Sequence, residues 1–80
     1  MKIYDFNGKK NICADRIKQA RRDLHLSQEQ LAARLQLEGV NIERDSVSRM
    51  EIGTRFIADY ELLALCRVLK VSPAFLLGME

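Results

Sequence analysis

The sequence lacks a long apolar run, although 48% of its 80 residues are apolar and 30% are charged, as in ordinary globular proteins. No stretch approaches the roughly 18 to 20 apolar residues that are needed to span a bilayer. The first ten residues, MKIYDFNGKK, contain no continuous apolar stretch that could form the core of a signal peptide. We therefore expect a cytoplasmic protein that does not contact a membrane.

Metal-binding and catalytic patterns are also missing. The two cysteines, Cys13 and Cys66, have no CxxC spacing, and His25 is the single histidine. A zinc site would need more ligands than these, so we expect no metal and no cofactor. Free cysteine packs as a small hydrophobe, and both thiols are therefore expected to be reduced and buried. Since no nucleophile with a base and no carboxylate pair is apparent, we expect no enzymatic activity.

The net charge of the chain is small, but its basic and acidic residues are unevenly distributed. The net charge is +2, yet residues 1–22 carry seven bases and two acids, whereas the other 58 residues carry six bases and nine acids. A basic segment of this kind suits an electrostatic contact with the phosphates of nucleic acid. A solvated basic segment with no partner is the alternative.

Helix signals follow one another closely after residue 12. A first helix is predicted over about residues 15–24, where Ile17, Ala20 and Leu24 form an apolar stripe. Arg21 lies on the same stripe. A charge on a core-facing stripe is costly unless it is paired, so Arg21 should have a carboxylate partner from elsewhere in the fold.

The second helix is predicted to begin after Ser27, whose hydroxyl can accept from a backbone N–H while Gln30 closes a capping box. It should stop at Gly39, which enters the left-handed conformation without strain. The residues expected to point inward are Leu31, Ala32 and Leu35.

The third helix has three possible N-terminal residues, Asn41, Glu43 and Asp45, and a clear C-terminal signal at Gly53. Its buried side should carry Val47 and Met50. The polar residues expected to face outward are Arg44, Asp45, Ser48 and Arg49.

Two further helices are predicted. Asp59 can cap a fourth, whose interior residues would be Leu62, Leu63, Leu65, Cys66 and Leu69. Ser72 and Pro73 open a short fifth, followed by Gly78. The expected fold is therefore an all-α, compact five-helix bundle over residues 12–80.

Residues 1–11 do not fit the helical pattern. Asn7-Gly8 is typical of a two-residue hairpin turn, but an isolated hairpin is marginal. A short N-terminal arm and a β-hairpin both remain open.

The segment LSQEQLAARLQLEGVNIERDSVSRME, residues 26–51, thus contains two helices separated by a Gly-containing gap. This is the layout of a helix-turn-helix, which makes double-stranded DNA the first partner to test.

From about residue 12 to residue 78 the chain resembles the Xre/Cro family of phage-repressor-type DNA-binding domains. The matching pieces, in the family's order, are RIKQARRDLHLSQEQLAARL, DSVSRMEIGTR and YELLALCRVLKVSPAFLLG. In that family the second helix lies across the DNA backbone and the third enters the major groove, usually from a dimer on a palindromic operator.

The resemblance assigns roles to individual residues. It implies base contacts by Arg44, Asp45, Ser48 and Arg49, which are chemically capable of reading base edges. It implies DNA-backbone contacts by Gln28, Thr54 and Arg55, with Arg16 and Arg22 as weaker candidates. It also implies an ion pair between Arg21 and Glu51, which supplies the partner that Arg21 requires.

The sequence departs from the family pattern in three places. Eleven residues separate Leu35 from Val47 where the family has about six, so either the turn is enlarged or the second helix gains a turn. Glu43 stands where a serine usually caps the third helix. Lys70 stands where many members end the fourth helix with glycine.

We therefore expect a sequence-specific transcriptional regulator, a repressor acting by operator occupancy as a homodimer, because the chain has no room for a sensor or activation domain. A protein-interaction module or antitoxin-type protein that binds a protein partner is the alternative. The dimer interface is expected in the fifth helix, among Phe75, Leu76, Leu77 and Met79, unless these residues only close the monomer core.

Overall fold

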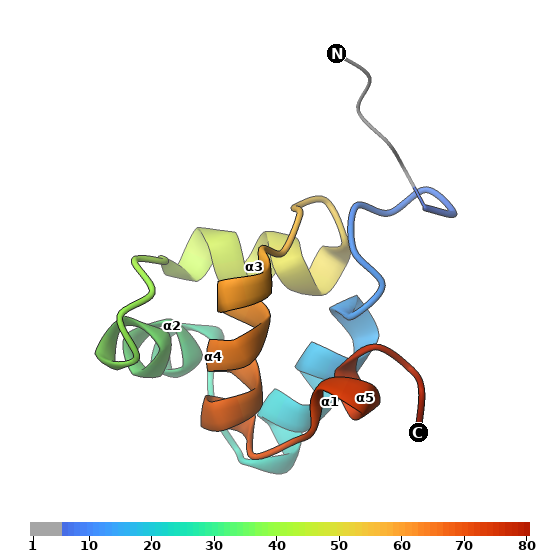
Figure 1. Cartoon of the computed structure of the whole chain (residues 1–80). Coiled ribbons are helices and arrows are strands. Elements are labelled where there is room, and N and C mark those ends of the chain that lie inside the picture. The colour runs from blue at the N-terminus through green and yellow to red at the C-terminus, as the bar shows by residue number, and fades with distance from the viewer. Residues whose placement is uncertain (1–5) are drawn as a thin grey trace.

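Five α-helices make up the part of the chain that the computed structural model describes, residues 6–80 (Figure 1). In chain order they are α1 (Ala14–Asp23), α2 (Gln28–Leu37), α3 (Arg44–Ile52), α4 (Asp59–Leu69) and α5 (Pro73–Leu76). Helix α3 packs against α1 and α2, while α4 packs against α1, α2 and α5. The predicted all-α fold of five helices is confirmed. Within residues 6–80, every helix is too short or too polar to cross a membrane.

The core draws on all five helices and on one loop. Its fully buried side chains are Ile17, Leu31, Leu35, Ile42, Val47, Met50, Leu65 and Leu76. Both cysteines are buried and unbridged, as predicted. Burial raises the pKa of the Cys13 thiol and of the Cys66 thiol, which keeps both protonated near neutral pH.

Three of the predicted helix boundaries are confirmed by local hydrogen bonds or backbone angles. The Ser27 hydroxyl accepts from the N–H of Gln30, whose side chain accepts from the N–H of Ser27, forming the capping box. The Ser72 hydroxyl caps α5 by accepting from the N–H of Phe75. Gly53 ends α3 at a φ of 94°, a conformation that favours glycine. Helix α1 begins and ends one residue earlier than predicted.

The predicted cap of α4 was wrong by one residue. Ala58, not Asp59, is the N-cap, and a methyl side chain cannot accept a hydrogen bond. The Glu61 carboxylate instead accepts from the N–H of Ala58, so the carboxylate half of a capping box forms alone. The inward placement of Leu63 was also wrong, because its side chain is 50% exposed. Helix α4 carries more apolar residues than one face can bury.

The extra residues between Leu35 and Val47 enlarge the turn between α2 and α3 and do not lengthen α2. Helix α2 ends at Leu37, and Gly39 adopts a φ of 87°. The chain then runs outside any helix to Glu43 and buries Val40 and Ile42 in the core. The Gln36 amide donates to the carbonyl of Ile42 at 2.8 Å, which ties the turn back to α2. The enlarged turn is therefore a packed part of the domain. Glu43 is the N-cap of α3 and makes no side-chain capping bond.

Residues 6–9 form a tight turn, although the rest of the predicted arm or hairpin, residues 1–5, lies outside the described range. Phe6 and Lys9 exchange backbone hydrogen bonds around Asn7-Gly8, both of which have positive φ angles. The N–H of Lys10 donates to the carbonyl of Gly53 at 2.8 Å. This segment is thus attached to the C-terminal end of α3.

Candidate nucleic-acid interface

A buried hydrogen-bond network fixes α3 against α1 and the start of α2. The Arg21 guanidinium donates to Glu51 through Nε at 2.7 Å and through Nη2 at 3.0 Å, and through Nη1 to the carbonyl of Leu26 at 2.7 Å. The Gln28 amide donates to the same Glu51 carboxylate at 3.1 Å. The structure therefore brings together Arg21 and Glu51, the two residues that the resemblance pairs, and adds Gln28 to them.

The two charges of this pair are largely removed from solvent. The side chains of Arg21 and Glu51 are 11% and 2% exposed. The hydrogen bonds that Arg21 donates to Glu51 raise the pKa of the Arg21 guanidinium above its usual range, against the opposing effect of burial. A forked, two-bond contact of this kind also fixes relative orientation, so the network sets the angle at which α3 lies on the domain.

The opposite side of α3 is polar and open to solvent. Arg44, Asp45 and Arg49 are exposed and Ser48 is half-buried, whereas Val47 and Met50 are fully buried. Arg44 and Asp45 are spaced four and three residues from Ser48 and so lie with it on one face of the helix. The four residues predicted to contact bases therefore form one surface.

The charged side chains on this surface are exposed and make at most long ion-pair contacts within residues 6–80. Arg44 Nη1 and Asp45 Oδ1 are 3.8 Å apart, with side chains 62% and 80% exposed. Arg49 forms no ion pair with any residue in the described range. An unpaired guanidinium on an exposed helix face can offer two N–H donors of one edge to a guanine, which presents two acceptors in the major groove.

Two of the residues predicted to contact the DNA backbone lie near the C-terminal end of α3. Gln28 is the first residue of α2, beside Glu51, and is half-buried. Thr54 follows the end of α3 and is exposed. Backbone N–H groups at the start of α2 and a hydroxyl after α3 are both of the kinds that bind phosphate oxygens.

Arg55 is engaged inside the protein. Its guanidinium donates through Nη1 and Nη2 to the two oxygens of Glu61, each at 2.9 Å, and through Nη1 to the carbonyl of Phe56. The Arg55 bonds lower the pKa of the Glu61 carboxyl, against the effect of burial. The contact closes the loop between α3 and α4, and it leaves fewer donors of Arg55 for DNA than the resemblance implies.

Arg16 lies away from the α3 surface, and Arg22 forms no ion pair within residues 6–80. The Arg16 guanidinium lies against the C-terminal segment, where a Cβ added to Gly78 would be 3.2 Å from Nη1. Arg22 is exposed in the last turn of α1. The structure thus does not bring Arg16 to the surface formed by α3.

Sequence reasoning missed the residue that connects the N-terminal segment to α3. The Asn11 amide donates to the carbonyls of Met50 and Arg55 at 3.1 and 2.9 Å, and its oxygen accepts from the N–H of Cys13. Asn11 satisfies carbonyls at the end of α3 and also starts the turn into α1. An asparagine two residues before the N-cap of a helix was the available signal, since this residue type commonly bonds a backbone N–H two positions on.

A pair of helices joined by a turn, with the second helix fixed from behind and its polar face exposed, defines a helix-turn-helix protein. Residues 13–76 match the helix-turn-helix domain family, and the chain belongs to that family. Searches of curated proteins and of solved structures found no match to the chain.

Proposed function

We propose that the protein is a sequence-specific transcriptional regulator of the Xre/Cro type that represses by occupying a palindromic operator as a homodimer. In this proposal α3 lies in the major groove, where Arg44, Asp45, Ser48 and Arg49 contact base edges. Gln28 and Thr54, both near the C-terminal end of α3, contact phosphates of the DNA backbone. The proposed mechanism is occupancy of a promoter or operator, and it requires no catalysis and no cofactor.

The observation that carries the proposal is the contrast between the two sides of α3. The inner side is fixed by a buried ion pair, and the outer side presents Arg49, which has no ion pair within residues 6–80, and further polar groups. A surface that reads base edges must be held at a defined angle, because hydrogen bonds to bases depend on direction. The Arg21–Glu51 network meets that requirement.

The first test measures binding to duplex DNA as a function of salt concentration. A protein that neutralises phosphates releases counterions, so the logarithm of its affinity should fall linearly with the logarithm of the salt concentration. A protein-interaction module should bind neither random nor palindromic duplexes. Retention of random-sequence duplex at low salt, with loss at high salt, is the expected result. The absence of binding at every salt concentration would favour the interaction module.

Substituting Arg49 with alanine is expected to relax specificity at one base pair in each half-site. Loss of a two-bond arginine–guanine contact should weaken operator binding by about 1 to 3 kcal/mol per contact. Arg49 is exposed and forms no ion pair within residues 6–80, so the melting temperature should not change. Competition between operator and random duplex in a fluorescence anisotropy titration measures the effect. Equal losses on the two DNAs would contradict base reading by Arg49.

The matched comparison is the substitution of Gln28 with alanine. A phosphate contact carries no sequence information, so this variant should bind operator and random DNA more weakly by the same factor. Gln28 also donates to Glu51, and a melting curve must therefore accompany the titration. A change in base preference at unchanged melting temperature would contradict the assignment of Gln28 to the DNA backbone.

A further inference from the structure

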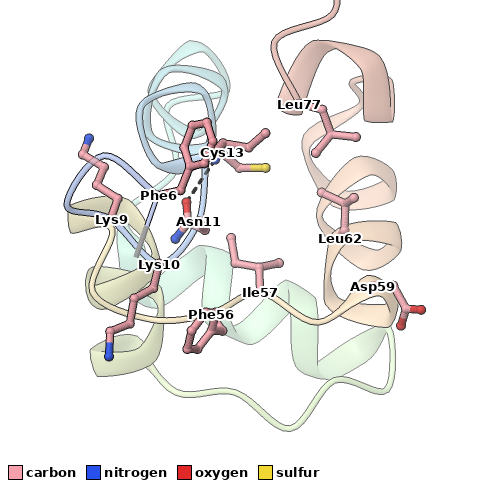
Figure 2. Close-up of a pocket in the computed structure, with 11 residues that line it drawn as sticks. Phe6, Lys9, Lys10, Asn11, Cys13, Phe56, Ile57, Asp59, Leu62 and Leu77 are labelled. Carbon is pink, nitrogen blue, oxygen red and sulfur yellow. Dashed lines mark hydrogen bonds between the residues drawn. The ribbon is translucent and has the colours of Figure 1, made fainter. Parts of the chain in front are cut away.

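A groove of about 760 Å³ opens between the N-terminal segment, the loop after α3, α4 and the end of α5 (Figure 2). Three of its apolar side chains are strongly exposed, with Phe6 at 63%, Phe56 at 51% and Ile12 at 48%. Leu62 and Leu77 line its other side (Figure 2). Single exposed apolar residues are common, but several around one hollow mark a surface that binds a partner. Two of the three are aromatic, as is typical of interface cores.

The charges around the groove are of opposite sign on its two walls. Lys10 lies on the wall formed by the N-terminal segment, and Asp59 lies on the wall formed by α4 (Figure 2). Lys9, on the same wall as Lys10, lies 3.8 Å from Asp15 and so already has a counter-charge. Among residues 6–80, no ion pair joins Lys10 to Asp59 across the groove. When the two-fold axis of a dimer runs along the groove, each wall meets the opposite wall of the other copy. A surface with a basic wall and an acidic wall is therefore complementary to itself.

The C-terminal helix offers less surface than the sequence suggested. Leu76 is fully buried, and Phe75 and Leu77 pack against the core, so α5 mainly closes the monomer. Only Met79, at 76% exposed, projects from this end among the four residues predicted for the dimer interface. The strongly exposed aromatic residues of the groove are Phe6 and Phe56.

We infer that the groove is the interface through which two copies of the chain form the homodimer, an inference that rests on the proposed function for its biological role. Phe6, Ile12 and Phe56 of each copy cover those of the other, and Lys10 of each copy faces Asp59 of its partner copy.

The position of the groove connects this interface to DNA reading. The N–H of Lys10 donates to the carbonyl of Gly53, and the Asn11 amide donates to the carbonyl of Met50, so the groove wall is bonded to the end of α3. The polar face of α3 is not part of the groove lining and stays free. An interface at this point fixes the separation of the two α3 helices. Reading two half-sites on one face of DNA requires such a fixed separation, of roughly 34 Å or a multiple of it.

The first experiment is sedimentation equilibrium of the full chain without DNA, at concentrations from about 1 to 100 μM. The native protein is expected to dimerise, and Ile12→Glu and Phe56→Glu are expected to weaken the dimer at least tenfold. The control is Leu37→Glu, which places the same charge on a residue that is 86% exposed at the end of α2, outside the groove. It should remain as dimeric as the native chain. Melting curves establish that all variants are folded.

The second experiment exchanges the two charges. Lys10→Glu alone and Asp59→Lys alone should each weaken the dimer. The double variant should recover it, because the residue at position 10 of one copy and the residue at position 59 of the other then again carry opposite charges. A monomeric native protein, unchanged dimers in both groove variants, or no recovery in the double variant would overturn the inference. Both dimerisation experiments are carried out without DNA. A native protein that dimerises through the groove but binds no DNA would therefore contradict the proposed function and still support the interface.

Discussion

Replacing Glu51 with glutamine is expected to lower the free energy of unfolding by about 3 to 5 kcal/mol, because it leaves the Arg21 charge buried without a counter-charge. The native carboxylate accepts two bonds from Arg21 and one from Gln28. An 80-residue domain has a total stability of only about 4 to 12 kcal/mol. The melting temperature should therefore fall by more than about 10 °C, as followed by circular dichroism.

Two further variants separate the charge effect from a general loss of packing. Replacing both partners, as Arg21→Met with Glu51→Leu, should recover most of the stability, because no unpaired charge remains. Asp45→Asn breaks the exposed contact with Arg44 and should change the melting temperature little. Equal melting temperatures for the native protein, Glu51→Gln and Arg21→Met would contradict the structural role of the pair.

Glu61→Gln is expected to cost about 1.5 to 3 kcal/mol at neutral pH through weakened bonds from Arg55. The effect should be smaller than for Glu51, since the Arg55 side chain is 29% exposed and can be hydrated when its partner changes. Glutamine still presents an oxygen to the N–H of Ala58, so the helix start should be retained. Urea unfolding at pH 7 measures the difference.

The Arg55–Glu61 pair also predicts that the free energy of unfolding depends on pH. Because the pKa of Glu61 is lowered in the folded state, its contribution is complete above the ordinary glutamate value of about 4.3 and is lost as the pH falls through the lowered value. The gap in stability between the native protein and Glu61→Gln should thus close toward pH 3. Glu29→Gln, a change at an exposed acid in the first turn of α2, is the control and should show no comparable gap. A gap that stays constant from pH 7 to pH 3 would rule out the proposed titration.

The helices were predictable because their signals are local. Ser27, Ser72 and Gly53 act through hydrogen bonds or backbone angles within a few residues of themselves, and such signals can be recognised in any sequence. The requirement of Arg21 for a carboxylate was also predictable, since a charge on an apolar stripe needs a partner. The identity of that carboxylate came from the resemblance, because Glu51 lies 30 residues away.

The features that were missed depend on contacts between distant segments. The bonds of Asn11 to Met50 and Arg55 span 39 and 44 residues, and no local pattern specifies them. The pairing of Arg55 with Glu61 depends on the path of the loop after α3. The N-cap of α4 is Ala58, one residue before the predicted Asp59. In the enlarged turn, the alternation of Val40 and Ile42 with polar neighbours was a signal for a half-buried extended segment.

Whether α3 reads DNA sequence can be tested by selecting binding sites from a pool of random duplexes with the native chain and with Arg49→Ala. The native chain is expected to enrich one two-fold symmetric sequence, and the variant is expected to enrich the same sequence with one base pair in each half-site unspecified. Enrichment of no sequence by the native chain, or of an identical sequence by both proteins, would contradict sequence reading by α3.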